Sequence, residues 1–151
     1  MLELCGVTKS YPQRGGRVAA LTSVSLRVKA GEFVAVQGPS GCGKTTLLLT
    51  AGGLLAPESG HVRLEGTSVY ESTAEERAGL RARRIGFVFQ QFHLVPYLHV
   101  LDNVRAPSLA LPNDSARQRA EHLVRHFGLW ERRNHYPGQL STGERQRTAL
   151  A

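Results

Sequence analysis

The sequence is poor in cysteine and aromatic residues and has no long apolar run. Its two cysteines, Cys5 and Cys42, lie far apart, which argues against a disulfide framework and gives no metal-ligand spacing. No stretch approaches the roughly eighteen apolar residues of a membrane-spanning helix, and Glu3 is an acid where a signal peptide carries bases. We therefore expect a cytoplasmic protein, or one held peripherally by a partner on the cytoplasmic face of the inner or plasma membrane.

The remaining composition is typical of one globular domain. With 151 residues, 41% of them hydrophobic and 21% charged, the chain can bury one core and is too short for two ordinary domains. The net charge of +7 comes from arginines scattered over several predicted helices, so solvated helix faces are favoured over an acidic partner or anionic lipid, and no nucleic acid is expected. His122 and His126 share a predicted helix face without a third ligand, which favours surface placement over a metal site.

Residues 38–45 are the most informative stretch and read Gly-Pro-Ser-Gly-Cys-Gly-Lys-Thr. They match Gly-x-x-x-x-Gly-Lys-Thr, follow an apolar run at residues 33–36 that predicts a buried strand, and precede a predicted helix at residues 46–51. A phosphate-binding loop requires this strand-loop-helix context. The glycines allow positive φ angles, so successive backbone N–H groups can converge on phosphate oxygens at the positive end of a helix.

Two side chains at the end of this motif add specific chemistry. The Lys44 ammonium can reach the terminal phosphates, and the Thr45 hydroxyl is placed to bind a magnesium ion. Cys42, inside the loop, is interpreted as a small spacer rather than a redox group. The predicted nucleotide-binding residues of the loop are Gly38, Pro39, Ser40, Gly41, Cys42, Gly43, Lys44, Thr45 and Thr46.

The chain as a whole divides into a mainly β first half and a helical second half. Besides residues 33–36, strands are predicted at residues 2–7, 19–28, 61–66 and 85–89. A helix capped by Ser72 or Thr73 is expected to run to about Arg83, and the strand at 85–89 should end at Gln90.

Two helices are predicted after Phe92. Residues 98–111 have a helical period, and Pro107 should end or kink that helix. Residues 115–127 form the clearest amphipathic segment, for which Asp114 is an available cap and Gly128 a stop.

A further helix should open at Ser141. Ser141 and Glu144 have the spacing of a capping box, in which the serine hydroxyl accepts the Glu144 N–H and the carboxylate accepts the Ser141 N–H. Thr142 and Gly143 lie between them, and the free N–H groups of this helix end could also receive an anion. Both interpretations stay open on the residues alone.

Together these motifs resemble the nucleotide-binding domain of ATP-binding cassette (ABC) proteins. The loop at 38–46, Gln90 after a strand, and Leu-Ser-Thr-Gly-Glu-Arg-Gln-Arg at 140–147 occur in the family's order, and the resemblance covers essentially the whole chain. The family signature reads Leu-Ser-Gly-Gly-Gln, from which Thr142 and Glu144 depart. The resemblance implies an α/β P-loop NTPase fold with an N-terminal antiparallel β subdomain, an incomplete RecA-like core and an α-helical signature subdomain.

The resemblance also implies roles for individual residues, with ATP and Mg²⁺ as cofactors. Tyr11 lies where the family stacks an aromatic ring on adenine, with ordinary packing as the alternative. Gln90 matches the glutamine that contacts magnesium and the attacking water. The expected catalytic residues are therefore Lys44 and Gln90, and the expected magnesium ligands are Thr45 and Gln90. A second copy of the domain should have its ATP site completed by Ser141, Thr142, Gly143 and Glu144.

Residues 85–104 resemble a subgroup that serves lipoprotein release, macrolide-type export and cell-division permeases. A groove for the coupling helix of a membrane permease is then expected at Phe92, Leu94, Val95 and Leu98, with ordinary core as the alternative. The implied function is the ATP-binding subunit of an ABC transporter, in which ATP binding and hydrolysis at a dimer interface drive the permease. The alternatives are a regulatory ABC ATPase that controls a membrane partner without transport, or a soluble non-transport ABC ATPase. A kinase or GTPase would not explain residues 140–147.

The resemblance also predicts the domain organisation. The 151 residues correspond to a single partial domain, with the β subdomain and P-loop core at 1–91 and the helical subdomain at 92–151. The family's Walker B strand, D-loop and switch histidine follow the signature helix, and Ala151 lies in its first turns. We therefore expect a C-terminally truncated domain without the general-base glutamate. Such a stretch should hydrolyse little ATP by itself, because losing a general base costs on the order of 10² to 10⁴ in rate.

Overall fold

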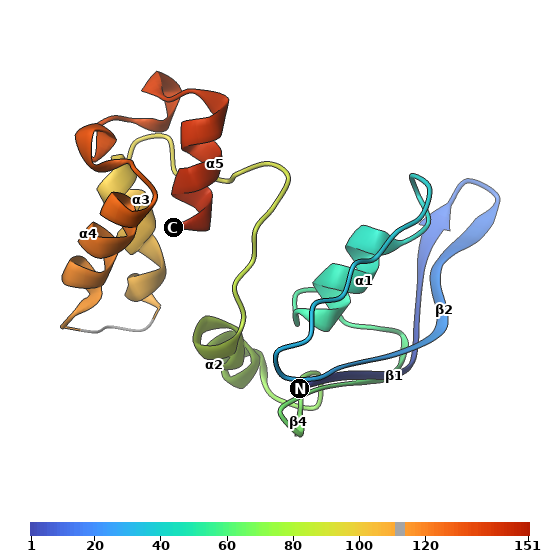
Figure 1. The fold of residues 1–151 in the computed structure, drawn as a ribbon. Helices are drawn as coiled ribbons and strands as arrows, with labels where there is room; N and C mark the ends of the chain where they lie inside the picture. The colour runs from blue at the N-terminus through green and yellow to red at the C-terminus, as the bar shows by residue number, and fades with distance from the viewer. Residues whose placement is uncertain (111–113) are drawn as a thin grey trace. The chain divides into compact units, whose positions relative to one another are not determined.

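The computed structural model describes residues 1–110 and 114–151 and divides into two compact units. The first unit is Met1–Ile85 and the second is Gly86–Ala151 (Figure 1). The first contains the described strands and two helices, and the second contains helices. The mainly β first half and helical second half predicted from the sequence are therefore confirmed. The expected division at residues 91 and 92 falls a few residues after the boundary between the units.

A four-stranded antiparallel sheet forms the base of the first unit. The strands are β1 (Leu2–Gln13), β2 (Gly16–Val28), β3 (Ser59–Leu64) and β4 (Thr67–Ser68), in the order β2-β1-β3-β4. β1 and β2 form a long hairpin in which Leu2 pairs with Val28 and Gln13 with Gly16. The hairpin confirms the predicted strands at 2–7 and 19–28, although both run further toward the turn than the sequence indicated.

Two helices accompany this sheet. Helix α1 (Lys44–Ala51) follows the glycine-rich loop, and helix α2 (Ala74–Arg84) begins after Thr73. The core of the unit is made by Leu4, Val7, Leu21, Val62 and Val69, with α1 contributing Leu47 and Ala51 and α2 contributing Leu80. The core therefore holds α1 against the strands of the sheet. Thr73 caps α2 in a capping box with Glu76, which confirms one of the two predicted caps.

Two strands predicted from the sequence are not formed. Residues 33–36 have no strand pairing, and Phe33 is 92% exposed rather than buried. Residues 85–89 are likewise unpaired, with Val88 58% exposed. An apolar run becomes a strand only when a neighbouring strand satisfies its N–H and C=O groups. Within residues 1–110 and 114–151, no segment pairs with either run, so both predictions are wrong for this structure.

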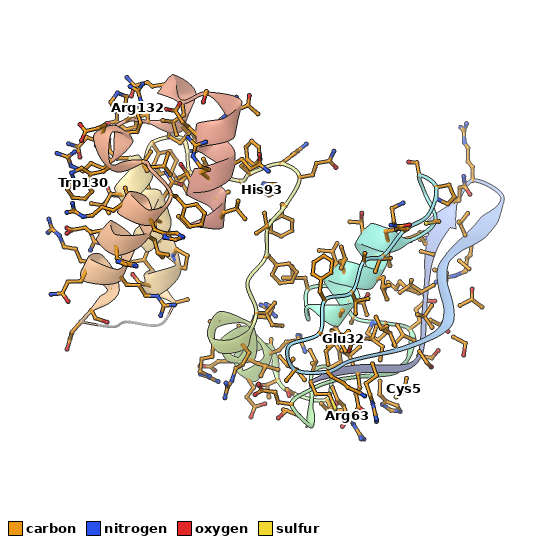
Figure 2. All side chains as sticks on the ribbon, viewed as in Figure 1. Cys5, Glu32, Arg63, His93, Trp130 and Arg132 are labelled. Carbon is orange, nitrogen blue, oxygen red and sulfur yellow. The ribbon has the colours of Figure 1, made fainter. Side chains whose placement is uncertain are left out.

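The second unit is a small helical domain. It contains α3 (Val100–Arg105), α4 (Ala116–His126) and α5 (Thr142–Leu150), joined by three 3₁₀ turns at Ala106–Leu109, Trp130–Arg132 and Pro137–Gln139. The buried residues of their shared core are Val100, Val124, Leu129 and Leu140. The guanidinium carbons of Arg125 and Arg133 lie 3.3 Å and 4.5 Å from the ring centroid of Trp130, which Figure 2 labels, so both make cation–π contacts with this ring.

The helix boundaries of this unit refine the predictions. The α-helix that begins at Val100 tightens into a 3₁₀ turn at Ala106, because Pro107 has no backbone N–H to continue the pattern. The predicted end at residue 111 lies outside the described residues. The N-cap of α4 is Ser115 and not the predicted Asp114, whereas Gly128 adopts a φ of +66° just after α4, as expected of a stop. Among the described residues, no helix is long and apolar enough to span a membrane.

Candidate functional site

The loop before α1 has the backbone that a phosphate cradle needs. Gly38, Gly41 and Gly43 have φ angles of 154°, 81° and 91°, which confirms the predicted positive values. At Gly43 a side chain is excluded for a second reason, because a Cβ atom there would lie 2.1 Å from the carbonyl oxygen of Ala20. The loop thus passes close to strand β2, and only glycine fits at that point.

Lys44 is the first residue of α1, and its side chain folds back over the loop. Its ammonium donates hydrogen bonds to the carbonyl oxygens of Gly38 and Pro39, at 2.8 Å and 2.6 Å, and lies 3.6 Å from the Cys42 sulfur. The backbone curves around the charge, so an anion placed in the loop would meet the ammonium directly. The Lys44 ammonium is therefore a compact positive charge that lies directly beside the backbone of the loop.

The N-terminal end of α1 is open to a ligand. Gly43 occupies the N-cap position without a side chain that could accept the first N–H groups, and the first turn contains no acidic residue. Thr45, in that turn, is exposed. Free N–H groups and the positive end of the helix dipole favour an anion at this position.

Tyr11 comes from strand β1 and approaches the same helix. Its hydroxyl lies 3.4 Å from the Thr46 hydroxyl, on the first turn of α1, and 40% of the residue is exposed. Two segments 35 residues apart therefore meet at this corner. The structure brings Tyr11 together with the loop residues, and its ring is accessible rather than sealed in the core.

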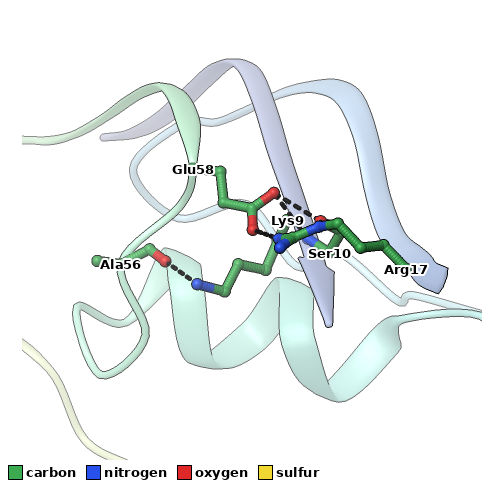
Figure 3. Close-up of polar contacts among 5 residues, drawn as sticks. All are labelled: Lys9, Ser10, Arg17, Ala56 and Glu58. Carbon is green, nitrogen blue, oxygen red and sulfur yellow. Dashed lines mark hydrogen bonds and ion pairs between the residues drawn. The ribbon is translucent and has the colours of Figure 1, made fainter. Parts of the chain in front are cut away.

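A cluster of polar residues near Tyr11 was not predicted from the sequence. Glu58 accepts hydrogen bonds from the Ser10 backbone N–H and hydroxyl at 3.2 Å and 2.7 Å, and it pairs with Arg17. The Arg17 Nε also donates to the Ser10 hydroxyl at 2.9 Å, and the Lys9 ammonium donates to the Ala56 carbonyl at 2.8 Å (Figure 3). Glu58 lies 48 residues from Ser10 and 41 from Arg17 along the chain, so no local spacing signals this cluster.

The predicted signature residues form the first turn of α5 in the second unit. Ser141 is the N-cap, its hydroxyl accepts the Glu144 N–H at 3.2 Å, and the Glu144 carboxylate accepts the Ser141 N–H at 2.8 Å. The predicted capping box is confirmed. Glu144 also accepts from Arg132 at 3.1 Å. The Ser141 N–H, followed by the Ser141 hydroxyl contact and the Arg132 charge, lowers the pKa of Glu144 below its ordinary value of 4.5.

Thr142 and Gly143 are exposed at this helix end. Because Glu144 occupies the Ser141 N–H, the accessible donors are the backbone N–H groups of Thr142 and Gly143. The Glu144 carboxylate places a negative charge beside these two N–H groups, and its ion pair with Arg132 compensates that charge. An anion at this turn therefore meets neutralised rather than repulsive surroundings.

Gln90 belongs to the second unit, whereas Tyr11 and the residues of the phosphate loop belong to the first. Gln90 is exposed and lies in an irregular segment before α3. The structure thus groups the predicted site residues into a set around α1, a set at the start of α5, and Gln90 by itself.

The segment after Gln90 borders a cavity of about 240 Å³ in the second unit. Phe92, Leu94 and Val95 line it, together with residues of α3 and α5, whereas Leu98, the fourth apolar residue predicted for a groove, does not. Asn103 holds this segment in place: its side chain accepts from the Val95 N–H at 2.7 Å and donates to the Val95, Leu98 and His99 carbonyls. No motif or spacing in the sequence signals this role of Asn103.

The described residues contain no group of three or more histidine, cysteine, aspartate or glutamate side chains that could hold a metal ion. The hydroxyl of Thr45 is nevertheless a ligand type that Mg²⁺ accepts, since this ion prefers oxygen and is commonly bound through one or two protein groups plus phosphate oxygens. The exposed Thr45 hydroxyl at the start of α1 is therefore an oxygen donor of a chemical type that suits this ion.

Comparison with known families decides the classification. The family model for ABC transporters matches residues 21–151, which includes the phosphate loop, Gln90 and the start of α5. The chain belongs to the ABC transporter family. This ABC chain is 42% identical over its whole length to the lipoprotein-releasing system ATP-binding protein LolD of Hyphomonas neptunium, and 42% identical to the macrolide export ATP-binding/permease protein MacB 1/2 of Paracoccus denitrificans.

Solved structures agree with this assignment. The ABC chain superposes with a TM-score of 0.90 and 38% identity on a dimeric post-hydrolysis structure of the ATP-binding cassette MJ0796 bound to ADP and Pi, covering 99% of this chain. The expected P-loop ABC ATPase fold is confirmed at this level. The chain spans 67% of the LolD relative, 67% of the MJ0796 cassette and 23% of the MacB relative.

Proposed function

We propose that this chain is the ATP-binding subunit of an ABC transporter of the export or lipoprotein-release type. The observation that carries the proposal is the loop at 38–46, in which three left-handed glycines and the folded-back Lys44 surround the uncapped end of α1. Membership of the family and the similarity to LolD and MacB support the same conclusion. In this function the loop binds the phosphates of ATP.

Different residues of the first unit bind different parts of the nucleotide. The backbone N–H groups of the loop and of the first turn of α1 bind the phosphate oxygens. Lys44 exchanges its bonds to the Gly38 and Pro39 carbonyls for bonds to the terminal phosphates, which are stronger because both partners are charged. Tyr11 offers its ring to the adenine base.

Magnesium would be held by Thr45 and Gln90 together with the phosphates, and it would neutralise charge that develops during phosphoryl transfer. Lys44 contributes to the same stabilisation through its charge, and Gln90 orients the attacking water. These two residues are the proposed catalytic residues of the chain.

The signature turn is proposed to act on a second copy of the chain. Ser141, Thr142, Gly143 and Glu144 open α5 at an exposed face, with N–H groups available at Thr142 and Gly143. The dimeric state of the MJ0796 cassette supports this arrangement. Two copies would then enclose two ATP molecules, each bound by the loop of one copy and the signature turn of the other.

The permease partner is proposed to dock on the segment after Gln90. Its apolar residues Phe92, Leu94 and Val95 line a cavity of about 240 Å³ beside α3 and α5, a size that suits a few side chains of an incoming helix. The chain would accordingly be peripheral on the cytoplasmic face of the inner or plasma membrane.

Equilibrium binding of Mg-ATP to the wild-type chain and to Lys44→Ala tests the central proposal. We expect the substitution to weaken binding about tenfold or more, since a hydrogen bond to a charged group contributes roughly 1.5–3 kcal/mol. Lys29→Ala, which removes an exposed lysine outside the loop, is the control and should bind as the wild type does. Equal affinities for the wild type and Lys44→Ala would refute the assignment of the loop.

A further inference from the structure

The β1–β2 hairpin extends beyond the part of the sheet that supports it. The last pair between β1 and β3 is Thr8 with Ser59, whereas β1 continues to Gln13. The β1–β2 register is itself irregular between Val7 and Lys9 and again between Lys9 and Ser10. From Ser10 onward β1 is therefore paired on one side only, and its other edge needs a different anchor.

Glu58 supplies that anchor with a side chain in place of a strand. Its carboxylate accepts the Ser10 backbone N–H at 3.2 Å, the group that a continuing β3 would have bound, and also the Ser10 hydroxyl at 2.7 Å. The Glu58 backbone is itself fixed, since its N–H donates to the Thr8 carbonyl at 2.8 Å. The position of the carboxylate is thus set by the backbone immediately before β3.

Arg17 closes the cluster from the neighbouring strand. It pairs with one Glu58 oxygen, while its Nε donates to the Ser10 hydroxyl at 2.9 Å. Ser10, Arg17 and Glu58 therefore form a ring of contacts that joins β1, β2 and the segment before β3 (Figure 3). A ring fixes geometry better than a single exposed ion pair, because moving one member breaks two contacts.

The residue fixed by this ring is the neighbour of Tyr11. Side chains alternate between the two faces of a strand, so a clamp on Ser10 leaves the Tyr11 side chain free on the opposite face. Tyr11 pairs with Val18 across the hairpin and reaches Thr46 on α1 through its hydroxyl at 3.4 Å. The distance between the Tyr11 ring and the phosphate loop therefore depends on how the hairpin is held.

We propose that Glu58 and Arg17 are positioning residues for Tyr11, and that they set the affinity of the site for the base of a nucleotide rather than for its phosphates. The inference rests on the proposed function, since it takes Tyr11 as the surface on which the base stacks. Neither residue touches the nucleotide in this scheme. Their effect reaches the ligand through the backbone of Ser10 and Tyr11.

The ionisation of Glu58 suits this role. The Ser10 hydroxyl contact lowers the pKa of Glu58 below its ordinary value of 4.5. Burial opposes this shift, and the Arg17 charge, the Ser10 N–H and the Lys9 charge each add to it. Glu58 is therefore a carboxylate at neutral pH and can accept all three contacts at once.

The test compares two ligands, ATP and inorganic tripolyphosphate, each titrated with magnesium into the full chain by calorimetry. We expect Glu58→Ala to weaken ATP about three- to tenfold and to leave tripolyphosphate within about twofold, because stacking on one base is worth roughly five- to 150-fold and misplacement loses part of it. Arg17→Ala should show the same split. Glu3→Gln is the matched control: Glu3 pairs with Arg27 across the same two strands, away from Tyr11, and its loss should change neither affinity.

A double-mutant cycle separates positioning from a general loss of structure. If Glu58 acts through Tyr11, adding Glu58→Ala to Tyr11→Ala should weaken ATP no further. Additive losses, or equal weakening of ATP and tripolyphosphate, would overturn the inference. If the alanine variant unfolds, Glu58→Gln replaces it, because glutamine keeps the side-chain volume and one accepting oxygen. This variant should also weaken ATP more than tripolyphosphate, although to a smaller degree. Equal effects on the two ligands would likewise overturn the inference. A wild-type chain that binds neither ligand would instead refute the proposed function.

Discussion

At the level of single residues, two glycines of the loop before α1 have similar backbone conformations but different surroundings. Gly41 and Gly43 both have positive φ angles, 81° and 91°, but only Gly43 faces a backbone carbonyl, that of Ala20, 2.1 Å from where a Cβ atom would be. Nothing lies within 4 Å of the corresponding position at Gly41. The two glycines thus share a conformation and differ in the space around them.

We predict that Gly43→Ala destabilises the chain by at least about 2 kcal/mol more than Gly41→Ala. Both variants carry the cost of a left-handed alanine, about 1–2 kcal/mol, and Gly43→Ala must also displace the backbone of β2. Urea unfolding monitored by circular dichroism measures the difference. Coincident unfolding midpoints for the two variants would show that the loop and β2 are not in contact.

Residue roles were predictable from the sequence where the chemistry is local. Lys44 and the three glycines lie within one motif, so spacing alone is enough to propose them as phosphate-binding residues. Glu58 could not be found in this way, because its partners Ser10 and Arg17 become neighbours only after the hairpin and β3 have formed. The position of Arg132 beside Glu144 is hidden for the same reason: the two lie twelve residues apart, on separate helical turns.

At the level of elements, the cap of α5 makes a prediction about acid. Because contacts lower the pKa of Glu144 in the folded chain, its contribution to stability is complete above the unfolded value near 4.5 and is lost as the pH falls through the lower folded value. We predict that lowering the pH from 7 to below 4.5 reduces the free energy of unfolding less for Glu144→Gln than for the wild type. Urea unfolding midpoints across that range measure the difference. Glu131→Gln, an exposed site in the same unit, is the control; a wild-type acid dependence retained by Glu144→Gln would contradict the prediction.

Tyr70 makes the opposite prediction for alkali. Its hydroxyl lies 2.7 Å from the carbonyl oxygens of Thr50 and Leu55, at the end of α1, and burial raises its pKa above the ordinary value of 10.0. The neutral hydroxyl therefore contributes stability below pH 10, and that contribution is lost as the pH rises through the raised pKa. We expect Tyr70→Phe to cost about 1 kcal/mol at neutral pH and to flatten the alkaline loss of stability. Tyr97→Phe, at a site 78% exposed, is the control; an unchanged alkaline slope in Tyr70→Phe would count against the role of this hydroxyl.

Helices were predicted better than strands in this chain. The caps at Thr73 and Ser141 and the break at Pro107 depend on residues a few positions apart, so local spacing defines them. The apolar runs at 33–36 and 85–89 also look like strands locally. A strand additionally needs a partner, which can lie anywhere in the sequence, and the described residues pair with neither run.

At the scale of the whole molecule, the responses of the two units to nucleotide should depend differently on protein concentration. Tyr11 and the loop at 38–46 belong to Met1–Ile85, whereas the signature turn at 141–144 belongs to Gly86–Ala151 and is proposed to act on another copy. ATP binding within one chain does not depend on its concentration once ligand is in excess. Contact with a second chain does.

We therefore predict two separable patterns of amide hydrogen exchange in Mg-ATP. In dilute protein, ATP at about one hundred times its Kd should stabilise the first unit by roughly 2.7 kcal/mol and slow exchange at 38–46, while residues 141–144 remain unchanged. In concentrated protein, exchange should also slow at 141–144 as pairs of chains form, and Lys44→Ala should lose both effects. Protection at 141–144 that already accompanies protection of the loop in the most dilute samples would mean that the signature turn acts within its own chain, and would overturn its assignment to a second copy.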